Sequence, residues 1–135
     1  MSDLQQNPAE PGRRTVLLRH VTKGGHHFDW MLEPPGPDAA PERLWTARVR
    51  LPSWCWRRAV TLDLQAIGAH RRAYLDYEGP VSGDRGDVRR VDEGRFDPAV
   101  WSDDLLVLKV QMGHYRGGLR VQRVAGDHWQ AVVEG

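Results

Sequence analysis

The stretch His27-Phe28-Asp29-Trp30-Met31-Leu32-Glu33, which follows His20 and a short Lys23-Gly24-Gly25 turn, decides how this chain folds. Successive side chains of a β-strand point to opposite faces. His27, Asp29, Met31 and Glu33 therefore share one face, and the three apolar residues between them share the other. Residues two apart on a strand are separated by about 6.6 Å, so an imidazole and a carboxylate can lean together onto one ion. The stretch predicts a strand with one apolar face and half of a metal site.

Length and composition predict a single globular domain. A chain of 135 residues is long enough to bury a core. It contains no apolar run near the roughly 20 residues that cross a bilayer, so we expect no membrane partner. Its start, Met1 to Gln6, does not resemble a secretory signal, and the lone Cys55 excludes an internal disulfide. These features favour the cytoplasm. Residues 1–13 are polar and contain proline, which predicts a flexible tail before one domain over 14–135.

Short strands separated by Gly, Pro or Asp make up most of the remaining pattern. They are expected at Thr15–Arg19, His27–Glu33, Leu44–Val49, Val60–Leu64, Ala73–Glu78, Asp87–Val91, Leu105–Gln111, Leu119–Val124 and His128–Val133. Many short strands with turns between them are typical of a closed barrel or a sandwich. We predict a mainly β fold, a small closed antiparallel barrel of about eight strands. One or two short helices are expected, at Leu51–Arg58 and around Asp97–Ser102, where Pro98 suits a first helical position.

The net charge of +1 does not by itself indicate or exclude a nucleic-acid partner. Of the lysines and arginines, however, all except Lys23 and Lys109 are arginines. Guanidinium groups suit bidentate contacts to phosphate, although a genome rich in guanine and cytosine also favours arginine codons. The candidates for a phosphate-facing surface are Arg48, Arg50, Arg57, Arg58, Arg71, Arg72, Arg85, Arg89 and Arg90.

A second group of polar residues lies in His70-Arg71-Arg72-Ala73-Tyr74-Leu75-Asp76-Tyr77-Glu78-Gly79. Read as a strand from Ala73, it places Tyr74, Asp76 and Glu78 on one face. An imidazolium and a phenol both donate hydrogen bonds to developing negative charge, so His70 and Tyr74 form a plausible phosphate-handling pair.

Together, these two stretches resemble the 3′-phosphoesterase domain of bacterial DNA ligase D. The pattern of that family is a His, a short loop and His-Tyr-Asp-Phe-Arg-Leu-Glu, followed later by His-Pro-x-x-Tyr-x-x-Phe-Glu-Gly. Further segments of this chain, Val91–Phe96, Gly117–Arg123 and the strand containing Trp129, resemble later parts of the same family.

The resemblance implies a manganese-dependent enzyme that removes 3′-terminal ribonucleosides and 3′-phosphates from DNA or RNA-DNA ends during end joining. By position, His20, His27 and Asp29 would bind Mn²⁺, and Zn²⁺ also suits this donor set. His70 and Tyr74 would contact the scissile phosphate as the catalytic pair. Glu33 would orient a ligand from the second coordination shell. A separate ligase or polymerase is the partner expected to act in trans.

Three departures from the family pattern affect these expectations. Met31 stands where the family has an arginine, so Arg48, Arg50 or Lys23 is needed to supply the charge that binds phosphate. The loop after His20 is one residue longer, which makes His26 the partner by strict counting. We prefer His27 because it shares the strand face with Asp29. The segment Trp45–Arg50 replaces a Trp-x-x-Pro-Lys-Gly-Pro stretch.

Two classes of function remain open. One is the metal-dependent phosphoesterase or nuclease described above. The other is a catalytically inactive module of the same fold that binds nucleic-acid ends. Without the family pattern, histidines at these positions would be read as structural or surface residues.

Overall fold

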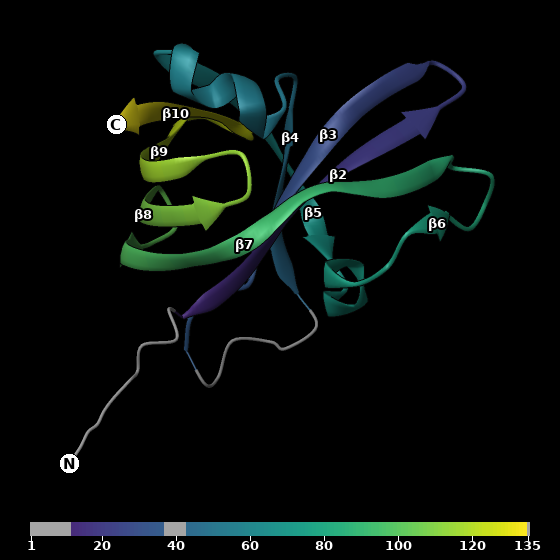
Figure 1. Ribbon diagram of the computed structural model, residues 1–135, viewed down its shortest axis with the longest axis horizontal. Coiled ribbons are helices and arrows are strands. Elements are labelled where there is room, and N and C mark those ends of the chain that lie inside the picture. The colour runs from purple at the N-terminus through teal and green to yellow at the C-terminus, as the bar shows by residue number, and fades with distance from the viewer. Residues whose placement is uncertain (1–11, 37–42, 135) are drawn as a thin grey trace.

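The computed structural model describes residues 12–36 and 43–134, and most of them lie in antiparallel strands (Figure 1). The strands are β2 (Arg13–Thr22), β3 (Gly25–Leu32), β4 (Leu44–Val49), β5 (Thr61–His70), β6 (Gly79–Pro80), β7 (Asp87–Trp101), β8 (Leu105–Met112), β9 (Arg116–Ala125) and β10 (His128–Glu134). Two short 3₁₀ helices, η2 (Ser53–Arg58) and η3 (Arg72–Leu75), interrupt them in the described part of the chain. No helix among these residues has the length and apolar character that crossing a bilayer requires.

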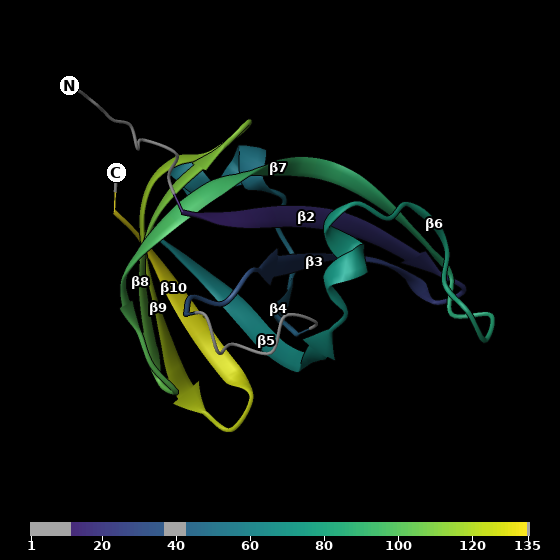
Figure 2. The ribbon, with the colours of Figure 1, turned by 90° about the horizontal axis from the view of Figure 1, so that it is seen from below.

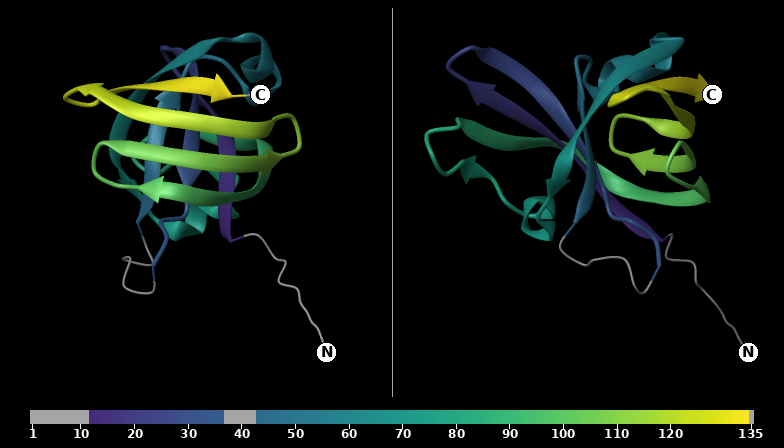
Figure 3. Two further views of the ribbon diagram at one scale, coloured as in Figure 1. Left: turned by 90° about the vertical axis from the view of Figure 1, so that its left-hand side faces the viewer. Right: turned by 180° about the vertical axis from the view of Figure 1, so that it is seen from behind.

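The sheet closes on itself. Its strand order is β2-β3-β4-β5-β10-β9-β8-β7-β6, and an additional pairing of β2 with β7 joins eight of these strands into a ring. Figure 3 shows β8, β9 and β10 side by side on one wall of this ring. The long strand β7 makes closure possible, because it pairs with β2 through residues 87–96 and with β8 through residues 94–101. The expected closed antiparallel barrel is confirmed.

Alternation along the strands gives the barrel two cores. The inner core fills the ring. It includes Leu17, Phe28, Trp30 and Leu32, together with apolar residues from all six remaining strands of the ring. The outer core lies on the other face of β2, β3 and the start of β7, and η3 packs over it (Figure 2). It consists of Val16, Leu18, Met31, Leu44, Leu75 and Val88. The polar face predicted for β3 is therefore covered by chain rather than open to solvent.

Most predicted strands overlap observed ones, but three predictions need correction. The predicted tail reaches residue 13, whereas β2 already includes Arg13, and residues 1–11 lie outside the described part of the chain. The helical turn expected at Asp97–Ser102 is wrong, because residues 97–101 belong to β7. Pro98 stands beside a register shift, where its missing N–H costs little pairing.

The strand expected at Ala73–Glu78 is also wrong. The amide of Tyr74 donates to the carbonyl of Arg71, and the amide of Asp76 donates to the carbonyl of Ala73, each at 3.0 Å. These are the i to i+3 bonds of a 3₁₀ helix. The turn inserts Leu75 into the outer core. The helix prediction at Leu51–Arg58 is confirmed in η2.

Candidate metal centre

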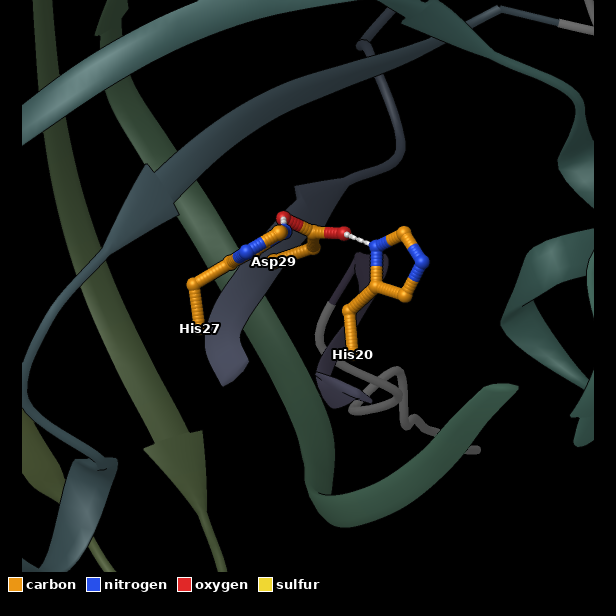
Figure 4. A group of neighbouring side chains, drawn as sticks. All are labelled: His20, His27 and Asp29. Carbon is orange, nitrogen blue, oxygen red and sulfur yellow. Dashed lines mark ion pairs between the residues drawn. The ribbon is translucent and has the colours of Figure 1, made fainter. Parts of the chain in front are cut away.

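Three potential ligands meet on the outer face of the β2–β3 hairpin. His20 and His27 are directly opposite each other in the register of the two strands, and Asp29 follows His27 on the same face. Figure 4 shows the Asp29 carboxylate between the two imidazole rings. Its oxygens lie 3.4 Å from Nδ1 of His20 and 3.2 Å from Nε2 of His27. The three donor atoms lie within 4.8 Å of one another, near the limit of about 4.4 Å for donors that share one ion.

His20 forms a hydrogen bond through the ring nitrogen that points away from Asp29. This bond determines the protonation of the nitrogen that faces Asp29. Nε2 of His20 lies 2.6 Å from the backbone oxygen of Arg85. A carbonyl oxygen only accepts, so Nε2 carries the hydrogen and donates it. In the neutral ring, the lone pair of Nδ1 then points toward the Asp29 carboxylate. Two electron-rich atoms facing each other favour a cation between them, as in the carboxylate, histidine and metal arrangements of known sites.

His27 and Asp29 also contribute buried atoms that a bound metal would satisfy. Nε2 of His27 and Oδ1 of Asp29 are buried and have no hydrogen-bond partner among the described residues. Unpaired buried polar atoms are costly, and both would be satisfied by coordination. Burial lowers the pKa of His27 and outweighs the opposite effect of the Asp29 carboxylate, with a smaller lowering effect from the positive charge of Arg48. Its ring is therefore neutral at pH 7 and has a lone pair available for a metal.

The structure separates His27 from His26. Strand alternation sends His26 to the opposite face, where its ring meets the edge of Phe28 with centroids 5.9 Å apart. His27 joins His20 and Asp29, although the family spacing favours His26. The extra loop residue is absorbed at the hairpin turn, where Gly25 has a φ of 132° that glycine adopts without strain.

A pocket of about 360 Å³ opens above the cluster and brings the second predicted motif to it. His20, Asp29, His70 and Tyr74 all line this pocket. His70 is the last residue of β5, and Tyr74 lies in η3, with the two ring centroids 5.5 Å apart. The Nδ1–H of His70 donates to the carbonyl of Gly68 at 2.7 Å, which leaves Nε2 available for a substrate. The two motifs predicted to act together therefore share one pocket.

Of the three predicted phosphate-binding cations, Arg48 lies beside the cluster. It is directly opposite Asp29 in the pairing of β3 with β4, and its positive charge contributes to the lowered pKa of His27. Lys23 instead forms an exposed ion pair with Asp84, 3.0 Å away, outside the pocket. Arg50 follows β4 and lines a different hollow with Thr61 to Asp63. Lys23 and Arg50 are therefore not placed at the pocket.

Arg71 and Arg85 line the pocket. The sequence marks both only as members of a large group of arginines, because their positions depend on η3 and on the turn before β7. The Arg85 guanidinium is held by Ser82, through its carbonyl at 2.7 Å and its hydroxyl at 3.0 Å. The Arg71 side chain is exposed and forms no hydrogen bond or ion pair within the described residues. It is the cation best placed to meet an anion in the pocket.

Glu33 does not take the predicted second-shell role. One carboxylate oxygen accepts the backbone N–H of Arg14 at 3.0 Å, and the other accepts from the guanidinium of Arg72. Neither of its hydrogen bonds involves His20, His27 or Asp29. Glu33 directly follows β3 and, through Arg72, attaches η3, which carries Tyr74, to the barrel. Its influence on the site is through the position of η3.

Met31 lies in the pocket at the position where the ligase D family has an arginine. Its side chain is 1% exposed and packs in the outer core with Leu75 and Val88. It contributes an apolar surface between Asp29 and the wall formed by η3.

No protein-family model matches this chain, and no curated protein has a significantly similar sequence. The resemblance to the ligase D domain consequently rests on the motifs themselves.

Proposed function

We propose that this protein is a metal-dependent phosphoesterase or nuclease that acts on the 3′ ends of nucleic acid. Its substrates would be DNA or RNA-DNA ends that carry a 3′-terminal ribonucleoside or a 3′-phosphate. The observation that carries the proposal is the pair of buried, unpartnered atoms, His27 Nε2 and Asp29 Oδ1, which face each other below a pocket lined by His70, Tyr74 and Arg71. Buried unpaired donors and acceptors in a pocket are expected at a functional site.

His20, His27 and Asp29 would hold a divalent ion, with Mn²⁺ favoured by the resemblance and Zn²⁺ compatible with the same donors. Such an ion supplies polarisation of the phosphate and a bound water of lowered pKa. Arg85 supports this role by fixing the hydrogen of His20 on Nε2. Three protein ligands leave coordination positions for water and substrate.

The remaining pocket residues would bind and orient the phosphate. The guanidinium of Arg71 presents a fork of N–H donors that matches two phosphate oxygens. The hydroxyl of Tyr74 would donate a hydrogen bond to the phosphate, and Nε2 of a protonated His70 would donate its proton to the leaving oxygen. A free 3′-hydroxyl is the product that a separate ligase or polymerase requires, so end joining in the cytoplasm is the setting we propose.

The inactive end-binding module is favoured by one observation. Met31 lines the pocket but can neither donate hydrogen bonds nor neutralise phosphate. A site of this kind would still bind a metal and an end without releasing product. Turnover separates the two functions.

The test is Mn²⁺-dependent processing of a labelled primer-template carrying either a 3′-terminal ribonucleotide or a 3′-phosphate. Asp29→Ala and His27→Ala are each expected to lower the rate by about 100-fold or more, because each removes a ligand. His128→Ala is the control, since its exposed ring pairs with Asp63 on β5 and lies outside the pocket. Absence of turnover by the native protein, with end binding retained, would establish the inactive module.

Metal binding is measured separately by calorimetric titration with Mn²⁺. His26→Ala and His27→Ala form a matched pair, because these neighbouring histidines project from opposite faces of β3. His27→Ala is expected to abolish the binding heat, and His26→Ala to leave it unchanged. Equal loss in both variants contradicts the proposed ligand set.

A further inference from the structure

Trp54 is a large aromatic side chain that the fold leaves half exposed. It is 51% exposed, although it belongs to η2, whose other tryptophan, Trp56, is fully buried in the inner core. The Trp54 ring makes T-shaped contacts with Phe28 and His114, with centroids 6.3 and 5.5 Å away. A ring that is held by two such contacts and is still half exposed has surface available for stacking.

Buried Asp92 fixes the two elements that hold this ring. Its carboxylate accepts the hydroxyl of Ser53 at 2.6 Å, next to Trp54 in η2. It also accepts the amides of Gly113 and His114, at 2.8 and 3.0 Å, in the turn between β8 and β9. Trp54 and His114 are therefore positioned by one buried group, which limits the entropy lost when a ligand stacks on Trp54.

Positive charge lies beside this aromatic surface. Arg19 is directly opposite Phe28 in the pairing of β2 with β3, and Arg89 is directly opposite Arg19 in the pairing of β2 with β7. Directly opposed like charges destabilise a sheet unless an anion lies near them. Asp87 pairs with Arg89 at 3.1 Å, whereas Arg19 has no ion pair within the described residues. We call Arg19, Phe28, Trp54, Arg89 and His114 the Trp54 platform.

We propose that the Trp54 platform binds an unpaired strand of nucleic acid, with a base stacked on Trp54 and the adjoining phosphate on Arg19. Exposed aromatic rings beside arginines are the means by which proteins bind single strands without reading their sequence. The charge of the platform complements a polyanion, and its aromatic surface fits the faces of bases. The proposal rests on the proposed function for its substrate class.

The platform is distinct from the metal centre. Phe28 and its neighbours lie on the face of β3 that turns toward the inner core, whereas His27 and Asp29 lie on the outer face. One layer of sheet thus separates the proposed binding surface from the proposed chemistry. The two are open to independent tests, and an unpaired strand on the platform would hold an end close to the pocket.

The experiment compares two labelled twelve-unit strands by fluorescence anisotropy at constant, low salt. One is oligothymidine, and the other is an abasic deoxyribose-phosphate strand of equal charge. The native protein is expected to prefer oligothymidine, and Trp54→Ala to weaken that binding by about 5- to 150-fold, equivalent to about 1–3 kcal/mol for one stacked base. The same variant is expected to leave binding of the abasic strand unchanged. Arg19→Ala is expected to weaken both strands equally.

Two further variants complete the design. Trp54→Tyr keeps an aromatic ring and is expected to restore most of the preference for bases. Arg120→Ala removes an exposed arginine from β9, outside the platform, and is the charge control. Equal affinity of the native protein for the two strands, or an unchanged preference in Trp54→Ala, overturns the platform and would favour a protein partner at Trp54.

Failure of the platform and failure of the proposed function give different results. If Trp54→Ala keeps both its strand preference and its Mn²⁺-dependent turnover, the platform is wrong and the phosphoesterase stands. If the native protein shows the preference but neither binds Mn²⁺ nor turns over, the phosphoesterase is wrong and the platform stands. Asp29→Ala is expected to bind oligothymidine as the native protein does.

Discussion

The backbone oxygen of Arg85 lies 2.6 Å from Nε2 of His20 and thereby directs the other nitrogen of that ring toward Asp29. This contact depends on Gly86, the next residue. Gly86 has a φ of 96°, and a Cβ there would lie 2.1 Å from the oxygen of Val21 and 3.3 Å from Nε2 of His20. The turn before β7 can therefore approach His20 only with glycine at this position.

Gly86→Ala is expected to move the Arg85 carbonyl away from His20 and to lower Mn²⁺ affinity by about 10- to 100-fold, as loss of an outer-shell partner does. The measurement is calorimetric titration with Mn²⁺. Gly36→Ala is the matched control, because Gly36 has a similar φ of 98° but nothing within 4 Å of its Cβ position. Equal Mn²⁺ affinity in the two variants contradicts the role of the Arg85 carbonyl.

Glu33→Ala is expected to lower stability without changing Mn²⁺ affinity. It removes the acceptor of the Arg14 amide and the partner of Arg72, and an unpaired buried donor costs about 1–3 kcal/mol. Urea unfolding measures the loss. The comparison variant is Asp76→Ala, which breaks an exposed ion pair with Arg14. It is expected to lower the free energy of unfolding by about 1 kcal/mol or less. A parallel loss of Mn²⁺ affinity in Glu33→Ala would return Glu33 to the second shell of the metal.

Tyr115 makes the free energy of unfolding depend on pH in the alkaline range. Burial raises the pKa of its phenol above the ordinary value of 10.0, so the unfolded chain ionises first as pH increases. The stabilising effect is complete below pH 10.0 and is lost as pH rises through the folded pKa. Tyr115→Phe loses the hydrogen bond to the Gly118 carbonyl, at a cost of about 0.5–1.5 kcal/mol near neutral pH. Urea unfolding should show the native advantage shrinking above pH 10.0, and a constant difference would contradict this.

The fold was predictable to the extent that side-chain alternation dictates it. Trp30 and Leu32 face the inner core, and Met31 faces the outer core, as period-two alternation on β3 requires. Ring closure depends on β7 pairing with both β2 and β8, which no local pattern in the sequence specifies. The segment around Leu75 was predicted incorrectly because a single buried side chain and two i to i+3 bonds outweighed its alternation.

The candidate site was also predictable only in part. Grouping His20, His27 and Asp29 required only the register of one hairpin, which the short turn at Gly24 and Gly25 nearly fixes. The contributions of Arg71 and Arg85 depend on how η3 and the turn before β7 fold back over the barrel. The error on Glu33 has the same origin, since its partner Arg72 is in η3. Contacts within one hairpin were accessible from sequence, and contacts between distant segments were not.

Met31 offers the sharpest test of the chemistry proposed for the pocket. Met31→Arg would place a guanidinium two residues from Asp29, where the ligase D family has one, at the expense of packing against Leu75 and Val88. A charged hydrogen bond contributes about 1.5–3 kcal/mol, so release of a 3′-phosphate is expected to rise by about 10- to 150-fold relative to removal of a 3′-ribonucleotide.

The comparison variant is Met31→Leu, which conserves volume in the outer core and is expected to leave the ratio of the two activities unchanged. Both ratios are measured with the same labelled primer-templates and Mn²⁺. Unfolding in urea shows whether the arginine is accommodated, because a buried guanidinium without a partner would lower stability by several kcal/mol. A folded Met31→Arg protein whose ratio matches that of Met31→Leu would show that position 31 does not contact the phosphate.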